Sequence, residues 1–242
     1  FLFDRVDDSN ALISRATAGA STANGDSIGK SLSSDGRYAL YSSMGNNLIS
    51  GVTDNNFARD VFLVDRQDNS KLLVSRAASA PTNSANGNSE PVALSADGRY
   101  VLFVSNATNL VSGISDNNGD SDVFLFDRDT GVNTLISRSS SSAASAAGFS
   151  QASALSPDGR YVLFYSNASD LVSGISDGNG TADVFVYDRV SGTSVLVSRS
   201  AAAANVTADD YSLPSALSDD GRFVLFFGYA NNVVNGVTDI NG

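Results

Sequence analysis

A unit of about 61 residues repeats four times along the chain, and this periodicity constrains the fold more than any local pattern does. The motif Asp-Gly-Arg followed by Tyr or Phe begins at Asp35, Asp97, Asp158 and Asp220. An Asp-Arg pair (Arg5, Arg66, Arg128, Arg189) and a Ser-Arg pair (Arg15, Arg76, Arg138, Arg199) keep the same period. Because each unit must stack on its neighbours to bury its apolar faces, the repeat predicts an array of similar structural units.

Each unit contains four short segments with the pattern of β-strands, and none has the pattern of a helix. The first, such as 27–33, holds small residues and one Leu and ends in an Asp-Gly turn. The second, such as 100–105, is a nearly continuous apolar run, which predicts a strand buried on both faces. The third and fourth, such as 122–138, form a hairpin around a short polar turn. Four strands per unit predict an all-β protein built of propeller blades.

The repeated pattern SxDGRYVxF…DVFVYDRxTGxTxLVSR resembles the PD40 repeats, which are TolB-like and related to WD40 repeats, of bacterial secreted and surface proteins. The resemblance covers the whole chain and implies a β-propeller. It implies little about activity, because such blades occur in colicin-linked envelope proteins, peptidase gating domains and adhesive surface proteins alike.

We therefore expect one β-propeller domain over residues 1–242, with repeat units at approximately 1–60, 61–122, 123–183 and 184–242. Phe1 aligns with Phe62, so the chain enters the pattern at a third strand. Pairing of the first two strands with the last two would close a four-bladed ring and remove exposed sheet edges. The alternative is a larger ring of six to eight blades, of which this chain is a fragment or which two copies complete.

Composition excludes several functions. The chain has no Cys and no His, so it cannot supply a thiolate nucleophile, a zinc thiolate site or a Ser-His-Asp triad. A net charge of −11 argues against nucleic acid as a partner, and no apolar run is long enough to span a membrane. Twelve of the fifteen basic residues occupy the three repeated Arg columns, which indicates fixed pairing with the repeated Asp residues.

The loop before each third strand carries regularly spaced carboxylate and amide oxygens. Hard oxygen ligands on a tight Gly turn suit Ca²⁺, and the candidate ligands are Asp116, Asn118, Asp120, Asp122, Asp177, Asn179 and Asp183. The same pattern is also typical of Asx turns, in which side chains hold the loop backbone. Phe57 and Arg59 interrupt the copy at 54–60, which favours the turn there, and a partial copy lies at 239–242. For 116–122 both interpretations stay open.

Departures from the repeat point to a second candidate site. Lys30, Glu90 and Gln151 lie on first strands and break the symmetry of their columns, so they are candidates for a ligand site in the central tunnel, with sequence drift as the alternative. The repeated Asp-Gly pair, by contrast, is interpreted as a turn in which Gly98 takes a positive φ.

These observations predict a non-catalytic, extracellular or cell-surface propeller that acts as a structural or binding module, with Ca²⁺ as a candidate cofactor and the periplasm as an alternative location. A protein or a surface polysaccharide is the expected partner, in a larger assembly. The alternative function is an enzyme-associated propeller, either the gating domain of a peptidase or a carbohydrate-active propeller that uses paired carboxylates.

Overall fold

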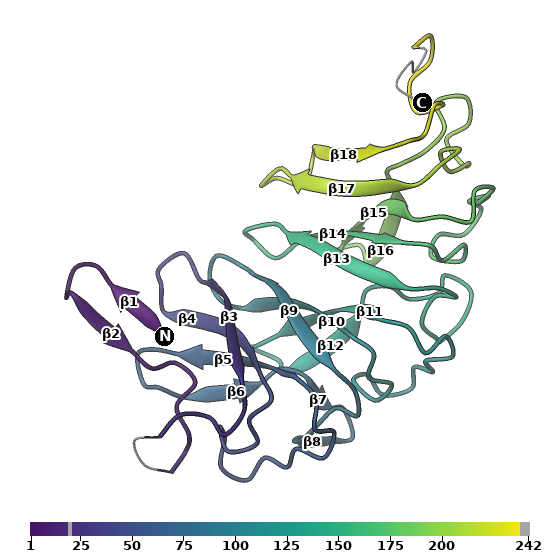
Figure 1. Cartoon of the computed structure of the whole chain (residues 1–242). Coiled ribbons are helices and arrows are strands. Elements are labelled where there is room, and N and C mark those ends of the chain that lie inside the picture. The colour runs from purple at the N-terminus through teal and green to yellow at the C-terminus, as the bar shows by residue number, and fades with distance from the viewer. Residues whose placement is uncertain (19–20, 238–242) are drawn as a thin grey trace. The chain divides into compact units, whose positions relative to one another are not determined.

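The computed structural model describes residues 1–18 and 21–237 and shows an all-β protein made of small antiparallel sheets (Figure 1). Three sheets have four strands, and their strands run β3-β4-β5-β6, β9-β10-β11-β12 and β13-β14-β15-β16. We call these sheets blades 1, 2 and 3. In strand order, blade 1 consists of Ser27–Leu32, Tyr38–Ser43, Asp60–Asp65 and Lys71–Leu73. Blade 2 consists of Ser89–Leu94, Tyr100–Ser105, Asp122–Asp127 and Val132–Leu135. Blade 3 consists of Ser150–Leu155, Tyr161–Ser166, Asp183–Asp188 and Thr193–Leu196.

Three further sheets have only two strands. The N-terminal hairpin consists of β1 (Leu2–Asp4) and β2 (Ser9–Ala11), and the C-terminal hairpin of β17 (Ser212–Leu217) and β18 (Val224–Gly228). A short extra pair, β7 (Arg76–Ala77) and β8 (Ala80–Ser84), follows blade 1. By position in the repeat, β1 and β2 are the third and fourth strands of a blade, and β17 and β18 are the first and second.

The four-stranded units that the sequence predicts are therefore confirmed as sheets, and the described residues contain no helix. The four closed blades are not confirmed, because no sheet in the described chain joins the N-terminal hairpin to the C-terminal hairpin. By contacts the chain divides into two compact units, Phe1–Ser112 with Phe126–Asn133, and Gly113–Leu125 with Thr134–Gly242.

The second and third strands form the core of each blade, as their apolar sequences predict. Every residue of β4 and β5 is buried, and Leu40 pairs with Leu63 across the two strands. In blade 3 the same columns place Leu163 opposite Val186. β-branched and aromatic side chains favour this sandwiched position because they pack well against neighbours on a pleated surface.

A β-bulge interrupts the first strand of every described repeat at the same place. The register shifts between Gly29 and Ser31 in β3 and between Ala152 and Ala154 in β13, with equivalent shifts in β9 and β17. Lys30 is thus the extra residue of the bulge in β3. A bulge increases the local twist and redirects one side chain, so this position tolerates residues as different as Lys and Ala.

Candidate functional site

The Asp-Gly-Arg residues of each repeat link the strands within one blade. Gly98 has a φ of +71°, as the sequence predicts. The Asp97 carboxylate accepts hydrogen bonds from the Ser95 hydroxyl (2.6 Å) and the Arg99 backbone N–H (2.9 Å). The Arg99 guanidinium donates two hydrogen bonds to Asp127, at 3.0 and 2.8 Å, and this forked pair holds the pKa of Asp127 below its usual range. The same pair recurs as Arg37–Asp65 and Arg160–Asp188.

The candidate calcium loops are Asx turns in all three described copies. The Asp116 carboxylate accepts hydrogen bonds from the backbone N–H of Asn118 (3.2 Å) and from the Ser145 hydroxyl (3.1 Å). The Asn118 side chain accepts one from the Asp120 N–H at 2.7 Å and donates one to the Ala146 carbonyl, also at 2.7 Å. Asn56 and Asn179 repeat these contacts with the carbonyls of Ala85 and Ala208. Each Asn thus links its loop to the loop that precedes the next repeat's first strand.

The last Asp of each loop is buried at the start of the third strand. Asp122 is only 2% exposed, and its carboxyl accepts a hydrogen bond from the Ser137 hydroxyl at 2.7 Å. Burial, and to a smaller extent repulsion from Asp116 and Asp120, raises the pKa of Asp122 to about 7. Asp60 and Asp183 are equally buried, bond to Ser75 and Ser198, and have the same raised pKa of about 7.

Asp120 contributes its backbone N–H to this turn, and one side-chain oxygen each of Asp116, Asn118 and Asp122 accepts hydrogen bonds from the protein. Within residues 1–18 and 21–237, no three acidic side chains are grouped to hold a metal ion. The donor set therefore fits a turn better than a Ca²⁺ cage, and calcium binding stays a prediction. The partial copy with Asp239 and Asn241 lies outside the described residues.

Two of the candidate tunnel residues, Glu90 and Gln151, bind different partners. Glu90 on β9 forms an ion pair with Arg59 at 3.5 Å, and Gln151 on β13 donates a hydrogen bond to the Ser121 hydroxyl at 2.9 Å. Both links reach the residues just before the preceding blade's third strand. Lys30 is exposed and lies at the rim of a pocket. The tunnel site also stays a prediction.

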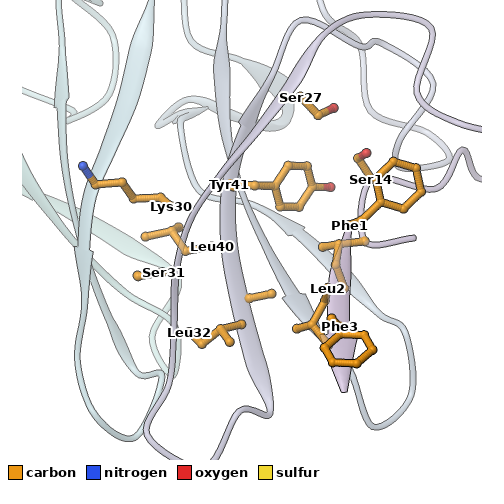
Figure 2. A pocket seen from close by; sticks show the side chains of 13 residues that line it. Phe1, Leu2, Phe3, Ser14, Ser27, Lys30, Ser31, Leu32, Leu40 and Tyr41 are labelled. Carbon is orange, nitrogen blue, oxygen red and sulfur yellow. The ribbon is translucent and has the colours of Figure 1, made fainter. Parts of the chain in front are cut away.

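That pocket, of about 340 Å³, lies between the N-terminal hairpin and blade 1 and was not found from the sequence (Figure 2). Its apolar lining comes from β1, from Ile13 and from β3 and β4, including Leu32, Leu40 and Tyr41. Figure 2 shows the Lys30 ammonium directed away from the β1 side chains. The buried Tyr41 hydroxyl has no hydrogen-bond partner among the described residues. Comparing the repeat columns could have revealed the pocket, because the N-terminal hairpin lacks first and second strands.

No family model and no curated protein matches the chain. Similar solved structures include TolB from Acinetobacter baumannii, with 14% identity and a TM-score of 0.46 over 90% of this chain and 44% of that chain. A prolyl endopeptidase has 12% identity and a TM-score of 0.43, covering 81% of this chain and 24% of its own. The acylaminoacyl peptidase of Pyrococcus horikoshii has 12% identity and a TM-score of 0.39, covering 81% and 27%.

The chain spans less than half the length of each of these proteins. All three TM-scores are below 0.5, so these likenesses assign neither a family nor an activity. No helix in the described part of the chain is long and apolar enough to cross a membrane.

Proposed function

We propose that the chain is a non-catalytic β-propeller of the PD40 type that serves outside the cytoplasm, in the extracellular space, at the cell surface or in the periplasm, as a structural or binding module. One observation carries the proposal: the repeated charged side chains serve the fold. Arg37, Arg99 and Arg160 each bind an Asp of their own blade, and the Asp loops bind backbone groups. A protein or a surface polysaccharide remains the proposed partner.

Burial of the perturbed carboxyls further supports a non-catalytic role. A general acid for glycoside hydrolysis needs a raised pKa and contact with the substrate. Asp60, Asp122 and Asp183 have the raised pKa, but each is only 2% exposed. The accessible Glu90 is paired with Arg59. The enzyme-associated propeller remains the alternative proposal.

The test is a search for turnover. Purified chain is incubated with peptide 4-nitroanilides and 4-nitrophenyl glycosides, alongside a heat-denatured sample and the variants Asp122→Asn and Glu90→Gln. We expect no product above the denatured sample. Turnover that either substitution abolishes would replace the proposal with the enzymatic alternative. Binding of a polysaccharide, measured as a rise in melting temperature, would support a binding module.

The arrangement of the blades stays a proposal in two forms, a four-bladed ring closed by the terminal strands and a larger ring. The two hairpins support both forms, because by their position in the repeat they are the two halves of one four-stranded blade. Mass in solution separates a closed four-bladed monomer from a larger ring that two copies complete.

A further inference from the structure

The C-terminal hairpin exposes an apolar column that the other repeats bury. Leu225 on β18 is 63% exposed, whereas the same column holds Leu40 at 1% and Leu102 and Leu163 at 0%. Phe227 on the same strand and Phe223, just before it, are also mostly exposed. In blades 1 and 3, the second strand pairs with a third strand, but in the part of the chain that the structure describes β18 pairs only with β17. The edge of β18 therefore lacks a strand of the third type.

The N-terminal hairpin shows the complementary deficit. β1 has the third-strand sequence, yet Phe1 is 91% exposed, while Phe62, Phe124 and Phe185 in the same column are buried. Phe3 is also exposed, while Val64 and Phe126 in its column are buried. What these side chains lack is a second strand beside them, which is the type of strand that β18 provides.

The charged column gives the register of the missing pairing. In blades 1 and 3, Tyr38 lies opposite Asp65 and Tyr161 opposite Asp188, which brings each Asp to the Arg that precedes the Tyr. The same register would pair Phe223 with Asp4 and place Arg222 beside the Asp4 carboxylate. Among the described residues Arg222 has no acidic partner. Asp4 accepts hydrogen bonds from the backbone N–H groups of Val6 and Asp7, and its one ion pair among the described residues is a long one with Arg66, at 3.9 Å.

The pocket beside β1 is the space that these strands would fill. Two first strands pack against the first three strands of the blade before them: β9 packs on β3, β4 and β5, and β17 packs on β13, β14 and β15. β3 has only β1 and β2 before it, and the apolar pocket lies between them (Figure 2). A β17–β18 hairpin packed there would cover Leu32 and Phe3.

We propose that the C-terminal hairpin of one copy pairs with the N-terminal hairpin of a second copy, forming a complete blade that we call the joint. Among the described residues each hairpin is a separate two-stranded sheet with an exposed apolar column. Each hairpin has the strand type and the charged side chain that the other lacks, so a second copy would complete both. Two joints close a dimer with eight blades, three complete ones from each chain and two shared ones. Eight blades lie within the range that propellers adopt, and closure removes the edges that otherwise promote unlimited association.

The first measurement is the mass of the 1–242 chain by light scattering at micromolar concentration. We expect twice the 25.0 kDa of one chain. Leu225→Asp should give a folded monomer, since Leu225 is exposed in the single chain and is not needed for its core. Val190→Asp is the matched control, because Val190 is similarly exposed but lies in the β15–β16 turn; this variant should stay dimeric. A wild-type monomer, or a Leu225→Asp dimer, would overturn the proposal.

A charge exchange then tests the register and separates the second copy from closure within one chain. Arg222→Asp alone and Asp4→Arg alone each put like charges together at both joints, and each should weaken dimerisation by at least about tenfold. Mixing the two variants restores an opposite pair at both joints of a mixed dimer, so dimers should reappear only in the mixture. If mixing restores nothing, while the double variant in one chain recovers the wild-type melting temperature as a monomer, the ring closes within one chain and the proposal is wrong. Larger species that grow with concentration would overturn the closed dimer.

Discussion

Raising the pH from about 4 to about 8 should destabilise the fold through the buried carboxyl groups of Asp60, Asp122 and Asp183. Each has a pKa of about 7 in the folded chain against an ordinary value of 3.8. At a pH between these values the unfolded chain loses these protons while the folded chain keeps them, so the free energy of unfolding falls as the pH rises. Above about pH 8 both states are ionised and the dependence ends.

The size of this pH effect on the free energy of unfolding follows from the shift in pKa. Three pKa units correspond to about 4 kcal/mol, and water entry around an ionised group reduces this, so each carboxyl should cost the fold on the order of 1–4 kcal/mol at about pH 8. For a chain of this size, 1 kcal/mol changes the melting temperature by about 2–4 °C. Each of these three carboxyl groups should therefore lower the melting temperature by several degrees at about pH 8.

The assay is thermal unfolding followed by circular dichroism, in buffers containing EDTA. Asp122→Asn keeps an acceptor for the Ser137 hydroxyl but cannot ionise, so it should be more stable than the wild type at about pH 8 and show a weaker pH dependence. Asp127→Asn is the control with the opposite sign, because it removes one of the two carboxylates that pair with Arg99, the other being Asp129, and should lower the melting temperature at the same pH. A wild-type melting temperature that stays constant or rises from about pH 4 to 8 would refute this account of the buried carboxyls.

Three further predictions concern the loops and turns. Phe57 adopts a φ of +55° where the equivalent Gly119 has +71°, and the Phe57 side chain is 81% exposed. Phe57→Gly should therefore stabilise the fold by about 1 kcal/mol in a melting experiment. A decrease in the melting temperature would contradict backbone strain at this position. Gly98→Val should destabilise the fold by about 3 kcal/mol or more, because the new Cβ would overlap the Tyr38 ring. Gly36→Val is the control, because its Cβ would meet only the end of a flexible side chain and should cost less stability. Equal losses of stability in the two variants would exclude the overlap as the cause. Calcium bound to loop 116–122 would raise the melting temperature at about pH 8 when CaCl₂ replaces EDTA, and identical curves would contradict the calcium prediction.

Much of the fold can be predicted from the sequence because the same turn and ion-pair residues recur in each repeat. The positive φ of Gly98 follows from an Asp-Gly pair at a strand end, and the Arg99–Asp127 pair follows from two charged columns with one period. The bulge at Lys30 is not predictable from the repeat alone, because it depends on the register against β4. The Asn118 contacts cannot be predicted from the sequence either, because the carbonyl of Ala146 belongs to a loop of the next repeat.

The sequence by itself determined the repeat, the strands of each blade and the residues of the turns and ion pairs, because these depend on neighbours within one unit. Only the tertiary structure decided what each unit packs against. Leu40 and Leu225 occupy the same column, yet one is buried and the other exposed, because β4 has a third strand beside it and β18 has none within the described residues. Likewise, the Asp116–Asp122 spacing suits both a metal site and a turn, and the hydrogen-bond partners of these side chains, Ser137 and Ser145 among them, come from other segments that only the tertiary structure brings close. Burial and hydrogen bonding are properties of the surroundings, and identical residues in a repeat differ wherever those surroundings differ.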